Sequence, residues 1–251
     1  MMAFLHVFGS KSMSQIKLDS IPTVHDSIET SHQEVTHLQL KKFIIPTVFL
    51  SYGIASLENP HLRILNSATR AEVLEDKPLR LHLDNYTQYV PAAMVYGLNM
   101  VGIKGKHNFK DRTVIYLTSQ VISAGIVVPL KRLVREERPD KSDNYSFPSG
   151  HTSTAFSSAQ FLFEEYKDTN LWLSLSGYPF AAFTGIYRII NNKHWVGDVM
   201  AGAGFGILST EIAYWLHPKM CKLFGSSEHA SIMLTPTYQN NTLGIGLVTA
   251  L

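Results

Sequence analysis

Six apolar segments follow one another along this chain, and their lengths limit the folds that it can adopt. They cover residues 43–57, 88–103, 113–130, 148–163, 171–187 and 198–216. Most lie at or just below the ~17–25 residues that a helix needs to cross a bilayer, and several contain Ser, Thr and Gly. Each segment taken alone would equally suit a buried helix of a soluble protein. Together they predict an all-α fold, a six-helix transmembrane bundle, within residues 41–225.

The charges between the segments favour the membrane alternative. If all six segments cross the bilayer, starting from the cytoplasm, the loop 104–112 is cytoplasmic. This loop carries four Lys or Arg residues and one acid, which is the bias expected of cytoplasmic loops. The loop 164–170 is net acidic and adds nothing to that bias. The mean hydropathy of +0.01 suits neither solvent clearly.

The remaining parts of the chain are expected to be accessory. Residues 1–40 are a polar N-terminal lead-in, and residues 58–86 predict a surface helix that lies in the membrane interface or packs on the domain. The tail, residues 226–251, alternates weakly and predicts a short β-hairpin.

The net charge of +2 and the lack of any nucleic-acid-binding motif argue against a nucleic-acid partner. The single cysteine excludes an intrachain disulfide and a Cys-based zinc site.

Two cations follow the third segment. Lys131 and Arg138 are seven residues apart, which places them on one side of the segment if it is helical. Arginine offers a planar fork suited to phosphate oxygens, and lysine offers a point charge. By themselves, these residues would also suit a solvated basic loop or side chains that snorkel at a membrane boundary.

The sequence Pro148-Ser149-Gly150-His151 begins the fourth segment. Proline suits the first turn of a helix, so the next three residues would lie at the positive end of that helix. Free backbone N–H groups there bind anions, and glycine lets an oxyanion approach the backbone. His151 could donate a proton to a leaving group.

A third cluster surrounds the start of the sixth segment. His194 and Asp198 are four residues apart, hence neighbours on one helical face, and Arg188 precedes His194 by six residues. A carboxylate held against one ring nitrogen leaves the other free to act as a nucleophile. A zinc site made of His151, His194 and Asp198 is an alternative, but three nearby cations would repel the metal. We therefore expect no metal and no cofactor.

The three clusters read, in order, K-x6-R-P, P-S-G-H and R-x5-H-x3-D, and the six-span arrangement puts all three on the same, non-cytoplasmic face. This series resembles the type 2 phosphatidic acid phosphatase family, which is shared with bacterial acid phosphatases and vanadium haloperoxidases. The resemblance covers residues 88 to 216 and implies a helical bundle whose phosphatases need no metal. One departure is Tyr187, which stands where the family usually has serine and affects one minor phosphate contact.

The resemblance also implies a role for each site residue. It makes His194 the nucleophile, Asp198 its orienting partner and His151 the general acid. The implied phosphate-binding residues are Lys131, Arg138, Ser149, Gly150 and Arg188.

We therefore expect a phosphatase that hydrolyses a phosphomonoester or diphosphate of a membrane lipid through a phosphohistidine intermediate. The expected location is the bacterial inner membrane, with the site on the periplasmic face and a lipid phosphate as partner. The alternatives are a soluble acid phosphatase of broad specificity, a vanadium-dependent haloperoxidase, and a lipid-phosphate-binding protein without turnover.

Overall fold

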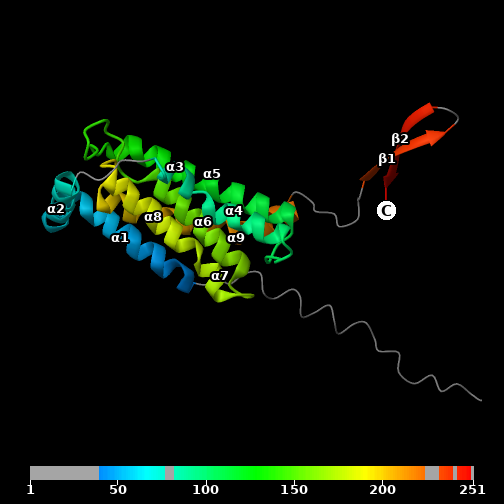
Figure 1. Ribbon diagram of the computed structural model, residues 1–251, viewed down its shortest axis with the longest axis horizontal. Helices are drawn as coiled ribbons and strands as arrows, with labels where there is room; N and C mark the ends of the chain where they lie inside the picture. The colour runs from blue at the N-terminus through cyan, green and yellow to red at the C-terminus, as the bar shows by residue number, and fades with distance from the viewer. Residues whose placement is uncertain (1–39, 77–81, 224–231, 240–241, 250–251) are drawn as a thin grey trace, which may run out of the picture. The chain divides into compact units, whose positions relative to one another are not determined.

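The computed structural model describes residues 40–76, 82–223, 232–239 and 242–249, so nearly all of the predicted lead-in, residues 1–40, lies outside the described residues. Helices account for most of this part of the chain (Figure 1). In chain order they are a 3-10 helix at Leu40–Phe43, α1 (Ile44–Glu58), α2 (Pro60–Asp76), α3 (Asp84–Thr87), α4 (Val90–Met100), α5 (Phe109–Val134), α6 (Gly150–Tyr166), α7 (Leu171–Leu175), α8 (Gly177–Ile190) and α9 (Val196–Leu223).

The helices follow the six predicted segments, with two kinds of difference. The region predicted as a surface helix contains both α2 and the short α3, and the predicted segment 171–187 is divided into α7 and α8. The described residues therefore hold more helices than the six predicted. A sharp corner separates α1 from α2, because the Asn59 side chain accepts a hydrogen bond from the His61 N–H (2.9 Å) and Pro60 begins the new helix.

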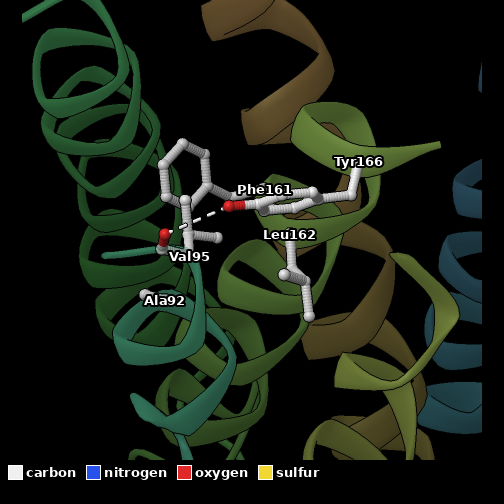
Figure 2. Close-up of a cluster of buried hydrophobic side chains, with 5 residues drawn as sticks. All are labelled: Ala92, Val95, Phe161, Leu162 and Tyr166. Atoms are coloured by element: carbon white, nitrogen blue, oxygen red, sulfur yellow. Dashed lines mark hydrogen bonds between the residues drawn. The ribbon is translucent and has the colours of Figure 1, made fainter. Parts of the chain in front are cut away.

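Helix α6 lies at the centre of the bundle and contacts α4, α5, α7, α8 and α9. Its buried face combines large apolar residues toward α4 with small residues toward α9. Figure 2 shows the apolar part, where Phe161, Leu162 and Tyr166 of α6 meet Ala92 and Val95 of α4. The Tyr166 hydroxyl donates to the Val95 carbonyl oxygen (3.3 Å), so this large ring is buried with its polar atom satisfied.

Glycine allows the close approach of α6 and α9. A Cβ atom added at Gly202 would lie 2.5 Å from the Ser149 carbonyl oxygen, and one added at Gly206 would meet the Ser153 carbonyl oxygen. Backbones this close are the usual consequence of small residues at a helix–helix contact. The contact holds the start of α6 against the start of α9, where two of the predicted clusters lie.

The tail contains two strands, β1 (Ile232–Gln239) and β2 (Thr242–Thr249). They pair antiparallel, with Ile232 opposite Thr249 and Gln239 opposite Thr242. None of the predicted site residues belongs to this part of the chain.

Candidate active site

His194 and Asp198 meet, although not on one helical face as predicted. Helix α9 begins at Val196, so His194 lies in the preceding turn. The His194 Nδ1 atom is 3.4 Å from Asp198 Oδ2, which also accepts hydrogen bonds from the Trp195 N–H (2.9 Å) and the Ser146 hydroxyl. Asp198 is thus fixed in the first turn and is placed to hold a proton on Nδ1 of His194, which leaves Nε2 with a free electron pair.

The His194 ring is only 2% exposed. Burial lowers the pKa of His194 to about 4, although the hydrogen bond with Asp198 acts in the opposite direction. The imidazole is therefore neutral at physiological pH, which is the form that can attack phosphorus.

Lys131 and Arg138 are held by the loop that follows α5. The helix ends at Val134 because Arg135 adopts a left-handed conformation (φ 52°), so the two cations do not share one side of a helix as predicted. The Lys131 ammonium donates to the carbonyl oxygen of Tyr145 (2.7 Å), one residue before Ser146.

Arg138 lies farther along the same loop, and its Nε is 2.7 Å from Asp143 Oδ1. Burial of Asp143 would raise its pKa, but hydrogen bonds from the Tyr145 N–H and from Arg138 outweigh this and lower it. Asp143 is therefore charged at neutral pH and fixes Arg138.

Arg188 lies in the last turn of α8 and is 7% exposed. Its Nη1 is 2.7 Å from Asp84 Oδ2, and Asp84, the first residue of α3, is completely buried. The Arg188 Nε is buried without a hydrogen-bond partner, so it has a donor available for a ligand oxygen. Sequence reasoning missed Asp84, because nothing in its spacing links it to a residue more than a hundred positions away.

The start of α6 differs from the prediction in one detail. Ser149 is the N-cap and the helix begins at Gly150, so Pro148 precedes the cap and is not in the first turn. The buried Ser149 hydroxyl bonds the Thr152 hydroxyl (2.8 Å), and the Ser149 N–H donates to the Asp198 carbonyl oxygen (3.0 Å). Ser149 therefore fixes the cap to α9, and the N–H groups that follow it remain as the anion-binding end of the helix.

His151 follows Gly150 and makes a contact that the sequence did not predict. Its Nε2 atom is 2.8 Å from the side-chain oxygen of Asn85. An amide oxygen only accepts hydrogen bonds, so this contact places a proton on Nε2 of His151. A general acid needs this Nε2 proton, and it also needs a proton on Nδ1 so that a neutral ring remains after the transfer.

The charges of the three clusters act on one another across the site. The positive charges of Lys131 and Arg188 act on the His194 ring. The His151 ring is affected by the same two charges and by that of Arg138. The fold therefore brings together, around one small region, residues that are spread between positions 131 and 198. The buried ring of His194, the half-buried ring of His151 and three cations are therefore close enough to affect one another.

The described residues give no support to the zinc alternative. In this part of the chain, the group of His, Cys and acidic side chains whose ligand atoms converge is Asp111, His217 and Cys221. These residues lie near the start of α5 and the end of α9, the helix ends opposite to those that carry Lys131 and Asp198.

The comparisons with known proteins agree with this geometry. The PAP2 superfamily profile matches residues 112–221. A lipid A 1-phosphatase of Helicobacter pylori is 30% identical over 138 residues, which cover 52% of this chain and 69% of that protein. The chain belongs to the PAP2 superfamily. A lipid A 1-phosphatase of Porphyromonas gingivalis is 38% identical over 135 residues, or 53% of this PAP2 chain, but the match spans only 30% of that relative.

A solved structure shares the fold of this PAP2 chain. The crystal structure of a transmembrane PAP2 type phosphatidylglycerolphosphate phosphatase from Bacillus subtilis aligns with a TM-score of 0.50 at 20% identity. The alignment covers 71% of this chain and 97% of that one. The helical arrangement is therefore that of a membrane PAP2 phosphatase.

Proposed function

We propose that this protein is a metal-independent phosphatase of a membrane lipid, and that its domain, residues 41–225, acts through a phosphohistidine intermediate. The observation that carries the proposal is the convergence of the neutral, buried His194 and its partner Asp198 with three cations and His151. A phosphoryl group bound there would have a nucleophile, an acid and neutralising charges around it.

The reaction has two steps. His194 Nε2 attacks phosphorus and the bond from phosphorus to the lipid oxygen breaks. His151, protonated on both ring nitrogens when the phosphate dianion is bound, passes its Nε2 proton to that oxygen and becomes neutral. A water molecule then gives its proton to His151 and attacks the phosphohistidine, which releases phosphate and restores neutral His194. The cations Lys131, Arg138 and Arg188 stabilise the charge that spreads over the phosphoryl oxygens in both steps.

The outer surface of the bundle supports a membrane location. Helices α5 and α9 are long and apolar enough to cross a bilayer, and only 22% of the most apolar stretch of α5 is buried within the protein. Val121 and Leu133 of α5 are 71% and 77% exposed. A continuous apolar helix face suits lipid better than water, which favours a membrane enzyme over a soluble acid phosphatase.

The substrate that the relatives favour is a phosphate on lipid A, since both relatives named above are lipid A 1-phosphatases. The six-span arrangement with a cytoplasmic loop at 104–112 puts the site on the periplasmic face of the inner membrane. We therefore propose lipid A phosphate as the substrate, the periplasmic face as the location of the site, and the roles of the site residues given above.

The proposal is tested by replacing the nucleophile in purified protein. His194→Ala should reduce phosphate release from lipid A by at least about 10³-fold, because no other group can form the covalent intermediate. The matched control is His61→Ala, at an exposed histidine on the outer side of α2, which should retain normal activity. Activity of the unaltered protein should survive EDTA. Normal turnover by His194→Ala, or loss of activity in EDTA, would reject this mechanism.

A further inference from the structure

Helix α2 lies across the catalytic end of the bundle and turns its polar side inward. It follows the corner at Asn59 and contacts α8 and α9 (Figure 1). Arg63, Asn66, Ser67 and Arg70 are spaced so that they share one face of the helix. All four line cavities beside the loop between α5 and α6, which is called the catalytic loop below. This is the reverse of the pattern in a helix that packs on a core by its apolar side.

The opposite side of α2 is open and mixed in character. Ile64 is 65% exposed and Leu65 is 48% exposed, and His61 and Glu72 are exposed beside them. Apolar and charged side chains together on an exposed helix suit the boundary between lipid and water.

A cavity of about 210 Å³ lies between α2 and the catalytic loop, lined by Arg63, Asn66, Ser67, Glu136, Glu137 and Trp195. A single water needs only about 10–15 Å³ of such space, so the cavity has room for a ligand group. None of the lining side chains is aliphatic. The polar groups and the Trp195 ring together suit a polar ring better than an acyl or polyprenyl chain.

The cavity adjoins the nucleophile. A smaller crevice of about 10 Å³ is lined in part by Asn66, Arg70, Trp195 and His194, so it shares two walls with the larger cavity. Trp195 is fixed in this position, because its indole N–H donates to the Glu137 carbonyl oxygen (2.9 Å). The Arg70 guanidinium carbon lies 5.9 Å from the centre of the Trp195 ring, which holds α2 over the site.

One buried acceptor in this cavity lacks a partner. Asn66 is 6% exposed and its Oδ1 has no hydrogen-bond partner. The Glu136 carboxyl, in contrast, interacts with Asp198. A buried polar atom that stays unpaired is costly, so Asn66 Oδ1 indicates a ligand that supplies a hydroxyl or amide donor. Arg63 and Ser67 offer donors of their own to the same ligand.

We infer that the polar face of α2, with Glu136 and Trp195, is a subsite for a hydroxyl-rich sugar headgroup whose phosphate lies at His194. A sugar presents several hydroxyl groups that both donate and accept, which suits a wall of amide, carboxyl and guanidinium groups beside an indole. A glycerol phosphate would fill less of the cavity and satisfy fewer of these groups. The inference rests on the proposed function and specifies the substrate class of the same site.

The test compares three substrates on purified full-length protein: lipid A with a phosphate on its sugar, phosphatidate, and p-nitrophenyl phosphate. Asn66→Ala should lower kcat/KM for lipid A by about five- to tenfold, mainly through KM, because one hydrogen bond to the sugar is lost. The other two substrates should change by less than about twofold, since they do not reach the subsite. Arg63→Ala, at an exposed position, should show the same selective effect and does not depend on the packing of Asn66.

Glu72→Ala is the matched control, because Glu72 is exposed on the outward side of α2. It should leave all three substrates unchanged. An equal loss on all three substrates in the Asn66 and Arg63 variants, or no loss on lipid A, would overturn the subsite. Unaltered protein that hydrolyses phosphatidate but not lipid A would also overturn it while leaving the phosphatase proposal intact. Unaltered protein that hydrolyses none of the three would overturn the phosphatase proposal itself.

Discussion

At the scale of single residues, the chemistry depends on the protonation state of His194. An ordinary histidine has a pKa of about 6.5 and would be largely protonated at pH 5. Burial lowers the pKa of His194 to about 4, so its ring stays neutral through the whole range from pH 5 to pH 8. In the proposed mechanism, His194 is therefore in its nucleophilic form before substrate binds.

This state can be measured directly. In NMR spectra of protein labelled at histidine nitrogen, the resonances absent from His194→Ala should titrate with a midpoint at about 4, because the ring is buried. Spectra of His61→Ala, at an exposed position, serve as the assignment control. A midpoint for His194 at or above 6.5 would show that the ring is protonated more readily than the buried geometry allows.

The residues with a chemical role were easier to predict than the residues that hold them. Lys131, Arg138 and His194 belong to three motifs whose order and combination resemble those of a phosphatase family. Asp84 and Asn85 belong to no such motif, yet they contact Arg188 and His151 at 2.7 and 2.8 Å. Only the tertiary fold brings them there.

At the scale of the helices, the site depends on the contact between α6 and α9. Gly202 lies against the Ser149 carbonyl oxygen, and the Ser149 N–H bonds the Asp198 carbonyl oxygen (3.0 Å). The same contact therefore positions the anion-binding helix end and the carboxylate that orients His194.

Gly202→Ala should disturb both groups. The new methyl group would lie 2.5 Å from backbone, which cannot move as a flexible side chain does, so the helices must separate. We expect a loss of about 1–3 kcal/mol in stability and a fall in kcat of at least about tenfold. Thermal unfolding in detergent and phosphate release measure the two effects.

Gly97→Ala in α4 is the matched control, because a Cβ atom there meets nothing within 4 Å. Alanine is a better helix former than glycine, so this variant should be at least as stable as the unaltered protein and fully active. Equal behaviour of the two glycine variants would show that close packing of α6 and α9 does not position the site.

Helix positions were largely predictable, and helix ends were not. Apolar length indicated where the long helices lie, but α5 stops at Arg135 and α9 starts after His194 because of local backbone geometry. As a result, the spacing correctly paired Lys131 with Arg138 and His194 with Asp198. In each pair, however, one residue lies in a loop and not on the predicted helix.

At the scale of the whole molecule, the two ends of the bundle have different chemistry. One end carries the catalytic loops, and the other carries the basic loop 104–112 together with Cys221 near the end of α9. In the proposed orientation the catalytic end is periplasmic and Cys221 is cytoplasmic.

Right-side-out membrane vesicles and an impermeant maleimide test this orientation. Cys221 of the unaltered protein should label only after the membrane is opened. Ser142→Cys, at an exposed position in the catalytic loop and combined with Cys221→Ser, should label in intact vesicles. The opposite pattern would place the site on the cytoplasmic face.

The measurement that tests the central claim most directly is the capture of the covalent intermediate. Protein is mixed with lipid carrying a radiolabelled phosphate and quenched at alkaline pH, where phosphohistidine survives, and the labelled peptide is identified by mass spectrometry. The account predicts label on His194, which disappears as water hydrolyses the intermediate and is never seen in His194→Ala. Steady phosphate release with label on another residue would contradict it.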